Sequence, residues 1–350
     1  MRAAFANCLL VLACCAAPIA VAAQPVAFDL QAHRGARALW PENTLPGFAY
    51  ALGLGVTTIE TDVGLTRDGV LVLSHDPRLN PDITRGPDGA FLAGRGPAIV
   101  DLDFDQLRTY DVGRIRPGTD YARQFDRQQP VDGTRIPRLD DLFALARQAG
   151  NEEVRFALET KVSPLAPRDT PAPQELARRL VAAIRAAGME QRSSILSFDW
   201  RTLQVVQQEA PGIATVYLTM QQPRAIDNIA AGQPEGSPWT AGFQLKDYGS
   251  VPRMVRAAGG HTWSSFWRDL TPESVGEAQA LGLRVLAWTV NDPAGMARMI
   301  EMGVDGIVTD RPDLLRAELQ RRGMPLPPAT ALPTASPPGH APPAPSDPGS

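Results

Sequence analysis

The feature that most constrains this 350-residue chain is a regular alternation between short apolar runs and amphipathic segments. Eight apolar runs are rich in strand-forming residues, at 26–34, 57–65, 154–162, 193–198, 213–219, 261–266, 284–290 and 306–310. Intervening segments, such as 138–150, 175–188 and 271–282, repeat apolar residues at helical spacing and end on glycine. This alternation predicts a parallel sheet, and eight strands in one α/β body favour a (β/α)8 barrel of the TIM type over an open doubly wound sheet.

One pair of strands departs from this alternation. The run 57–65 is soon followed by Asp68-Gly69, a dipeptide typical of a two-residue hairpin turn, and then by a second run at 70–76. Two residues cannot connect parallel strands, so the second run is predicted to be an extra antiparallel strand. The following stretch, 77–134, is rich in Gly, Pro and Asp, and we expect it to form a small insertion beside the mouth of the barrel.

The first residues differ from the body in composition. Arg2 precedes an apolar run too short to span a bilayer as a mature helix, and the small residues after it suit a signal peptidase. We expect residues 1–23 to be a signal peptide and the protein to be secreted across the inner membrane into the periplasm. All three cysteines, Cys8, Cys14 and Cys15, lie in this segment, so the mature chain would have no disulfide. Lipoprotein anchoring at Cys14 is the alternative.

The far end of the chain, 324–350, is dense in Pro with Ala, Ser and Gly, which predicts a disordered tail. The expected folded body is therefore 24–323. The net charge is −4 and no basic run occurs, so the composition argues against a nucleic-acid partner. We expect no stable membrane span, and the sequence leaves the oligomeric state open.

Acidic residues are poor strand formers, so Glu60 and Asp62 within one predicted strand need a reason. Their spacing of two places both side chains on one face. A two-residue turn at Asp68-Gly69 would place Asp62 opposite His75, whereas a three-residue turn would place Thr61 there. Two buried carboxylates on one face require a cation or a pair of arginines, and near the C-terminal end of a barrel strand the position favours chemistry.

Two further strand ends carry matching groups. His33 and Arg34 close the first strand, and Glu159 and Lys161 share a face at the end of 154–162. Three carboxylates without cysteine are typical of an oxygen site for Ca²⁺ or Mg²⁺. Histidines suit acid–base chemistry near neutral pH, and an arginine with a lysine suits a phosphate. Together these groups indicate phosphodiester cleavage.

These residues belong to motifs that follow one another along the chain: HRG (33–35), PENT (41–44), IETDV (59–63), TRDGVLVLSHD (66–76), LETK (158–161), SFDW (197–200), WTVND (288–292) and GVDGIVTDRPD (303–313). The series closely resembles the glycerophosphodiester phosphodiesterase family over essentially the whole folded body. The insertion after the HD motif, His75-Asp76, resembles that of the secreted, periplasmic branch of the family. The resemblance implies a barrel of the phospholipase C-like phosphodiesterase kind.

The resemblance also implies roles for individual residues: metal ligands at Glu60, Asp62 and Glu159, catalytic histidines at His33 and His75, and phosphate contacts at Arg34 and Lys161. Phe198 and Trp288 either wall the glycerol pocket or pack inside the barrel. Glu42 of the PENT motif either orients the site or complements the N-terminus of the following helix, whose cap would be Asn43 or Thr44.

The expected reaction is hydrolysis of glycerophosphodiesters, such as glycerophosphocholine and glycerophosphoethanolamine, to glycerol 3-phosphate and an alcohol. We expect His33 to act first as base on the glycerol 2-hydroxyl and His75 to act first as acid; direct attack by a metal-bound water is the alternative. One divalent cation is expected, Ca²⁺ rather than Mg²⁺ in an extracellular setting. Alternative functions on the same barrel are a phospholipase that acts on intact lipids and a non-catalytic surface binding protein.

Overall fold

The computed structural model describes residues 27–222, 226–230 and 233–330. The predicted signal peptide, with its three cysteines, and residues 331–350 of the predicted tail lie outside these ranges. None of the helices within them combines the length and the hydropathy that a membrane crossing requires.

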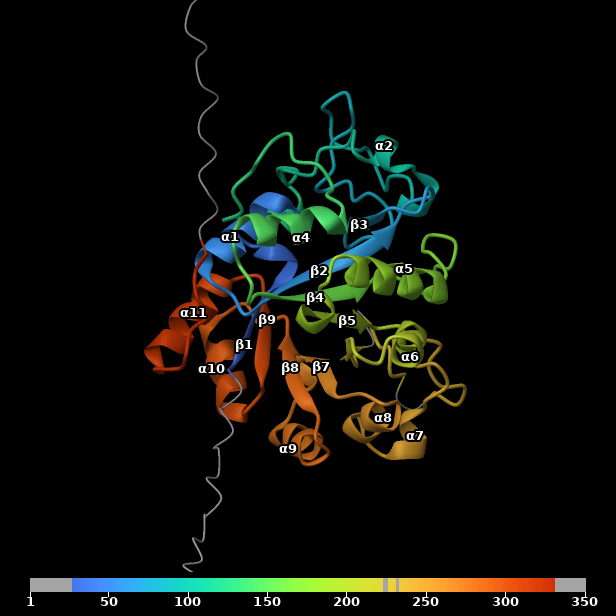
Figure 1. Cartoon of the computed structure of the whole chain (residues 1–350), viewed down its shortest axis with the longest axis vertical. Helices are drawn as coiled ribbons and strands as arrows, with labels where there is room; N and C mark the ends of the chain where they lie inside the picture. Colours follow the sequence, from blue (N-terminus) through green and yellow to red (C-terminus); the bar gives the residue numbers. More distant parts are fainter. Residues whose placement is uncertain (1–26, 223–225, 231–232, 331–350) are drawn as a thin grey trace, which may run out of the picture.

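Eight parallel strands form a closed barrel, as predicted (Figure 1). They are β1 (Asp29–Ala32), β2 (Thr58–Leu65), β4 (Arg155–Thr160), β5 (Ser193–Ser197), β6 (Ala214–Thr219), β7 (Thr262–Phe266), β8 (Arg284–Trp288) and β9 (Gly306–Thr309). Strand β1 pairs with both β9 and β2, which closes the ring. Each predicted apolar run contains one barrel strand, and the open sheet is excluded.

Helices follow the strands and cover the outside of the barrel (Figure 1). They are α1 (Leu45–Leu54), α4 (Leu139–Gln148), α5 (Pro173–Ala186), α6 (Trp200–Glu209), α7 (Leu245–Tyr248), α8 (Val251–Ala257), α9 (Pro272–Ala280), α10 (Pro293–Met302) and α11 (Pro312–Arg321). Their inward faces are apolar; α5, for example, buries Leu176, Leu180 and Ile184. The predicted start of α9 is confirmed, since the Thr271 hydroxyl accepts a hydrogen bond from the amide of Ser274 at 3.2 Å.

The inside of the barrel is filled by an apolar layer of Ala157, Leu196, Val216, Leu218 and Leu286. These side chains are all at least nine-tenths buried. The barrel is therefore a packed core rather than a pore, and the layer separates its two mouths.

The hairpin is present, but its turn is longer than predicted. Strand β3 (Leu71–Leu73) pairs antiparallel with β2, and Leu65 aligns with Leu71. The amide of Gly69 donates to the carbonyl of Thr66 at 3.0 Å, and Gly69 has a φ of 84°. A glycine in the left-handed region completes a three-residue turn, so the predicted two-residue turn is wrong.

This register changes how His75 reaches the mouth of the barrel. The amide of Ser74 donates to the carbonyl of Asp62 at 3.0 Å, so Ser74 rather than His75 lies beside Asp62. The paired strand ends at Leu73 and the chain bends at His75. Because the chain has left the ladder, the alternation of faces no longer governs His75, and its side chain still points into the mouth.

The insertion 77–134 forms a small unit beside this mouth. It contains η2 (Ile99–Asp101), α2 (Phe104–Leu107) and α3 (Asp120–Gln124). Together with flanking residues it has a hydrophobic cluster of its own, made of Val72, Leu79, Ile99, Leu107, Val112 and Ile136. The insertion is therefore a packed excursion rather than a loose loop, and it lies above α4 in Figure 1.

The beginning of the predicted disordered tail packs against the barrel. Met324 and Leu326 contact the main hydrophobic core. Arg316 donates to the carbonyl of Pro327 at 2.8 Å, and the amide of Thr330 donates to the carbonyl of Leu52 at 2.9 Å. Proline lacks a donor but keeps its carbonyl, so a Pro-rich segment can still pack in an extended form. The body therefore extends past the predicted boundary at 323.

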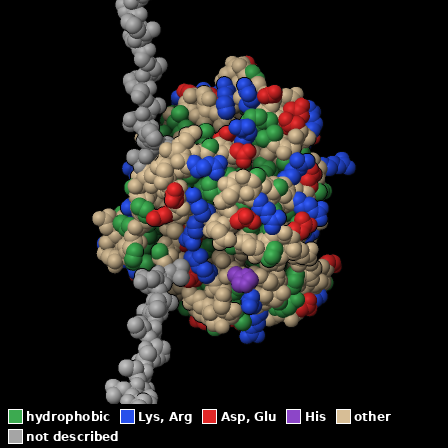
Figure 2. Space-filling view, in the orientation of Figure 1, with side chains coloured by type: hydrophobic (Ala, Val, Ile, Leu, Met, Phe, Trp, Pro, Cys, Tyr) green, Lys and Arg blue, Asp and Glu red, His purple; other side chains and the backbone are tan. Residues whose placement is uncertain are grey.

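Basic and acidic side chains are interspersed over the face shown in Figure 2. Ion pairs on the outside of the protein include Arg178 with Glu209 at 2.9 Å and Arg253 with Glu277 at 2.7 Å. Exposed pairs of this kind contribute little to stability, so the fold depends mainly on its apolar core.

Candidate active site

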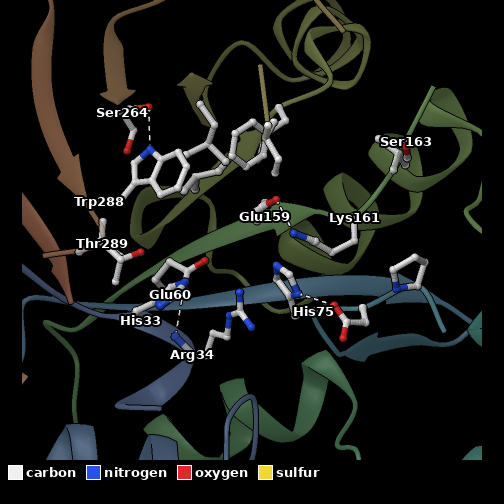
Figure 3. Close-up of a pocket in the computed structure, with 18 of the residues that line it drawn as sticks. His33, Arg34, Glu60, His75, Glu159, Lys161, Ser163, Ser264, Trp288 and Thr289 are labelled. Atoms are coloured by element: carbon white, nitrogen blue, oxygen red, sulfur yellow. Dashed lines mark hydrogen bonds and ion pairs between the residues drawn. The ribbon is translucent and has the colours of Figure 1, made fainter. Parts of the chain in front are cut away.

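The C-terminal ends of the strands surround a cavity of about 430 Å³ (Figure 3). One half of its lining is charged and comes from the segment after β1, from the hairpin and from the end of β4: His33, Arg34, Arg37, Glu60, His75, Asp76, Glu159 and Lys161. The other half is largely apolar and comes mainly from the later strands: Leu196, Phe198, Leu218, Trp239, Trp288 and Val308. The cavity suits a small molecule with one charged part and one uncharged part.

Three buried carboxylates converge in the charged half. Glu60 and Asp62 lie on one face of β2, and Glu159 is aligned with Asp62 on the neighbouring strand β4. One oxygen from each lies within 4.8 Å of the other two. Asp62 Oδ1 has no hydrogen-bond partner among the described residues. Converging oxygen ligands, one with unused lone pairs, fit a divalent cation such as Ca²⁺ or Mg²⁺.

Two positive side chains lie beside the three carboxylates without balancing them. Arg34 Nε is 3.2 Å from Asp62 Oδ2, and Lys161 Nζ donates to Glu159 Oε1 at 2.7 Å. Burial and the charges of Asp62 and Glu159 raise the pKa of Glu60 well above its usual range. Burial also opposes ionisation of Asp62, but Arg34 and Lys161 lower its pKa. The raised pKa of Glu60 means that a third negative charge in this cluster is costly without a cation, and a divalent cation would offset that cost.

The sequence suggested that the first strand continues into the HRG segment, but the structure shows that it does not. The strand ends at Ala32, and His33–Gly35 form the 3₁₀ turn η1, in which Arg34 has a φ of 50°. This conformation allows the Arg34 amide to donate to Glu60 Oε2 at 3.0 Å. The Arg34 guanidinium meanwhile donates to Glu42 Oε1 at 2.9 Å. The turn thus fixes a buried arginine at the edge of the cavity.

Replacement of Gly35 by alanine should destabilise the protein by roughly 2–5 kcal/mol, because strain and overpacking add together. An added Cβ would lie 2.7 Å from Cδ1 of Phe48, and Gly35 has a φ of 74°. Chemical denaturation measures the loss. The matched control is Gly53→Ala on α1, where an added Cβ meets nothing within 4 Å, and which should be neutral or slightly stabilising. Equal stabilities for wild type and Gly35→Ala would contradict the prediction.

Asp310, at the end of β9, holds His33. Nδ1 of His33 lies 2.5 Å from Oδ1 of this fully buried carboxylate. An ionised carboxylate only accepts, so Nδ1 carries the proton and Nε2 keeps its lone pair. Burial lowers the pKa of His33 although Asp310 opposes the shift. A neutral imidazole with an available Nε2 suits a proton acceptor.

Asp310 is itself anchored by two side chains. Arg37 donates to both of its oxygens at 3.0 Å, and Asn291 donates to Oδ2 at 2.7 Å. Burial opposes ionisation of Asp310, but Arg37 and His33 lower its pKa. The sequence reasoning assigned no role to Asp310, Arg37 or Asn291. The available signal was an acid placed directly after a buried strand, at the end of a barrel where chemistry is expected.

His75 has a comparable carboxylate partner. Its Nδ1 lies 2.7 Å from Oδ1 of Asp76, whose other oxygen accepts from Asn80 at 2.8 Å. In Figure 3 the ring lies between Arg34 and Lys161. Burial, with the positive charges of these two residues, lowers the pKa of His75. Cationic neighbours favour loss of the ring proton, which suits a proton donor.

Residues of the PENT motif hold residues of the site by hydrogen bonds. These contacts decide between the two interpretations of Glu42. Glu42 binds Arg34 and accepts a hydrogen bond from Tyr121 of the insertion. Asn43, with a φ of 54°, donates to Asp62 Oδ2 at 2.9 Å and accepts from Thr61 at 2.7 Å. Thr44 rather than Asn43 is the cap of α1. Glu42 therefore orients the site.

Phe198 and Trp288 form part of the apolar wall. Their rings meet edge to face, with centroids 5.4 Å apart, and both pack on the apolar layer inside the barrel. The indole of Trp288 donates to the carbonyl of Ser264 at 3.1 Å. The two interpretations offered by the sequence are thus compatible, because both rings line the cavity while they pack on the core.

Eight of the nine predicted site residues line the cavity: His33, Arg34, Glu60, His75, Glu159, Lys161, Phe198 and Trp288. The ninth, Asp62, lies behind them and pairs with Arg34 and with Lys161, whose Nζ is 3.5 Å from Oδ1. Hence one site brings together all the residues that the sequence singled out.

Comparison with known families matches residues 33–314 to the glycerophosphoryl diester phosphodiesterase family. The chain belongs to this family. A glycerophosphodiester phosphodiesterase of Caldanaerobacter subterraneus is 30% identical to it over 292 residues, which cover 83% of this chain and 97% of that protein. The protein is therefore a hydrolase, a glycerophosphodiester phosphodiesterase.

Solved structures support the fold of this phosphodiesterase. A protein from Silicibacter pomeroyi with a provisional glycerophosphoryl diester phosphodiesterase name is 36% identical, with a TM-score of 0.76, covering 86% of this chain and 96% of that one. A phosphodiesterase of Oleispira antarctica, solved with its product sn-glycerol-3-phosphate, is 21% identical with a TM-score of 0.60, covering 84% and 97%.

Proposed function

We propose that this phosphodiesterase hydrolyses small glycerophosphodiesters, such as glycerophosphocholine and glycerophosphoethanolamine, to glycerol 3-phosphate and the free alcohol. The observation that carries the proposal is the division of one cavity into two halves: a charged half with two histidines and three basic side chains, and a half with an uncharged wall. The bound product of the Oleispira antarctica protein, which has the same fold, supports the choice of glycerol 3-phosphate as product.

The phosphate would bind between Arg34 and Lys161. Both side chains line the cavity and both pair with Asp62, so they flank the same point. Arg34 offers a planar guanidinium to phosphate oxygens, and Lys161 offers a compact ammonium. Phe198 and Trp288 would then contact the uncharged part of the diester.

The two histidines would transfer the protons. His33 Nε2 takes the proton of the glycerol 2-hydroxyl while that oxygen bonds to phosphorus, and His75 gives a proton to the departing alcohol oxygen as its bond to phosphorus breaks. In the second step His75 takes a proton from the attacking water as the water oxygen bonds to phosphorus, and His33 returns its proton to the glycerol 2-oxygen as the bond from that oxygen to phosphorus breaks. The hydrogen bonds to Asp310 and Asp76 keep both rings oriented throughout.

Glu60, Asp62 and Glu159 would hold one divalent cation, which would compensate negative charge on the phosphate oxygens. We favour Ca²⁺ over Mg²⁺ because the N-terminal sequence suggests secretion into the periplasm. Residues 1–23 would be removed as a signal peptide, with lipoprotein anchoring at Cys14 as the alternative. The mass of the mature N-terminus distinguishes these two outcomes.

Purified protein should release glycerol 3-phosphate from glycerophosphocholine with Ca²⁺, and chelator should abolish the release. Intact phosphatidylcholine should be a poor substrate, since the charged half of the cavity lies among buried side chains. Coupled assays for released choline and phosphocholine, run with the two substrates under chelator and under each cation, make the comparison. Equal turnover of the intact lipid would favour a phospholipase, and inertness toward every diester would favour a binding protein.

A further inference from the structure

A second cavity, of about 160 Å³, lies at the opposite, N-terminal mouth of the barrel. It is lined mainly by residues at the beginnings of strands: Asp29, Gln31, Thr58, Arg155, Ser193, Ala214, Thr262 and Arg284. Its inner wall is made of Ala157, Leu196, Val216 and Leu286, which belong to the apolar layer inside the barrel. That layer separates this cavity, which we call the lower cavity, from the catalytic one.

The lower cavity has more positive than negative charge. Arg155, Arg192 and Arg284 line it together with a single carboxylate, that of Asp29. Arg155 Nη2 and Arg284 Nη2 lie 3.4 and 3.9 Å from the same oxygen of Asp29, too far for strong hydrogen bonds. The two guanidiniums therefore have donors that the protein leaves available.

Asp29 is already occupied by closer partners. Thr58 donates to its Oδ1 at 2.7 Å, and Gln31 Nε2 donates to its Oδ2 at 3.0 Å. The Gln31 amide can face a carboxylate only through its nitrogen, so its Oε1 is left to accept elsewhere. The carboxylate thus has closer partners than the two arginines, and the positive charge of the three arginines in the lining exceeds its single negative charge.

Unpartnered polar atoms gather around this cavity. Among the described residues nine buried side-chain atoms have no hydrogen-bond partner, and four of them belong to residues that line this cavity: Arg284 Nε and Nη2, Ser193 Oγ and Gln31 Oε1. Ser193 and Gln31 are more than nine-tenths buried. Nε and Nη2 form the side edge of a guanidinium, which matches two oxygens of one oxyanion.

We propose that the lower cavity binds a tetrahedral phosphate, either inorganic phosphate or the phosphate group of a small monoester. Arg284 would bind two of its oxygens, and Ser193 and Arg155 would donate to a third. Gln31 Oε1 would accept from the remaining P–OH group, which favours a hydrogen phosphate over a fully deprotonated oxyanion such as sulfate. The volume corresponds to about five water volumes, enough for an anion of five heavy atoms.

Calorimetric titration of the whole chain with inorganic phosphate tests the proposal. Arg284→Met should weaken phosphate binding at this site by tenfold or more, and sulfate should bind more weakly than phosphate to the wild type. A parallel titration with glycerol 3-phosphate shows whether a monoester enters as well as the free ion. The matched control is Arg298→Met, an exposed arginine on α10, which should leave the affinity unchanged.

Binding at the catalytic cavity must be told apart from binding here. Arg34→Met should weaken an anion held at the catalytic cavity and leave the lower site intact. Should Arg284→Met fail to fold by circular dichroism, Ser193→Ala, which removes one hydroxyl, should still weaken phosphate several-fold. The proposal is overturned if wild type binds no phosphate at millimolar concentration, or if binding is lost in Arg34→Met and retained in Arg284→Met.

Discussion

Glu60→Gln is expected to lower kcat for glycerophosphocholine by about 10³-fold, the effect typical of removing a group that supports charge stabilisation in the transition state. Glutamine keeps the size of the side chain but removes one of the three charges that converge within 4.8 Å. The affinity for Ca²⁺ should fall in parallel. Initial rates of glycerol 3-phosphate release and calorimetric titration with Ca²⁺ measure the two effects.

The same variant has an opposite effect on stability that sharpens the test. Burial and neighbouring carboxylates raise the pKa of Glu60, so ionised Glu60 costs free energy in the metal-free protein. In chelator, Glu60→Gln should therefore unfold at a Tm equal to or above that of the wild type. Glu152→Gln, on an exposed side chain, is the control and should change neither quantity. Wild-type activity in chelator would remove the cation from the mechanism.

His33→Ala is expected to lower kcat by roughly 10²–10⁴-fold, the usual contribution of a positioned acid or base. Asp310→Asn should lower kcat as well, because the amide can donate to Nδ1 and so favour the wrong tautomer of His33. KM should change little in either variant. Steady-state kinetics of both variants check this, with His261→Ala as the control on an exposed histidine.

The assignment of base and acid is tested with a second substrate. A glycerophosphodiester of p-nitrophenol has a leaving group that needs no proton. His75→Ala should therefore lose far less activity on this ester than on glycerophosphocholine, whereas His33→Ala should lose similar activity on both. Reversal of this pattern would exchange the two roles, and wild-type kcat for His33→Ala on both substrates would refute the mechanism.

The barrel was predictable because its signal is repeated. Each strand shows as an apolar run, and each helix shows as an amphipathic segment with its own cap, so an error in one element does not change the architecture. The catalytic cluster was predictable because acids within β2 contradict strand propensity and needed a chemical reason. Glu60 and Asp62 lie where the period of two placed them, on one inward face.

Two predictions were wrong, the length of the hairpin turn and the end of the first strand. Both depend on the backbone conformation of a single residue. Asp68-Gly69 occurs in two-residue and in three-residue turns, and only the left-handed Gly69 as third residue shows which is present. Arg34 at a φ of 50° ends the first strand before His33, which no propensity scale predicts. His33, Arg34 and His75 still reach the cavity, because all three follow the last paired residue of their strands.

The partner of His33 was missed for a different reason. Asp310 lies 277 positions away along the chain and becomes a neighbour only because β9 pairs with β1 when the barrel closes. The sequence shows that both residues follow strands, but not which strand ends become adjacent. Arg37 and Asn291, which hold Asp310, depend on the same closure.

The insertion has a consequence for how this enzyme can change. Tyr121 binds Glu42, which holds Arg34, while the Phe125 ring lies 4.6 Å from the guanidinium of Arg37, which holds Asp310 and through it His33. Two chains of contacts thus connect the insertion to Arg34 and to His33, the proposed phosphate-binding residue and the proposed base. Exchange of this segment between relatives would alter catalysis itself, so the segment and the first βα loop must evolve as one unit.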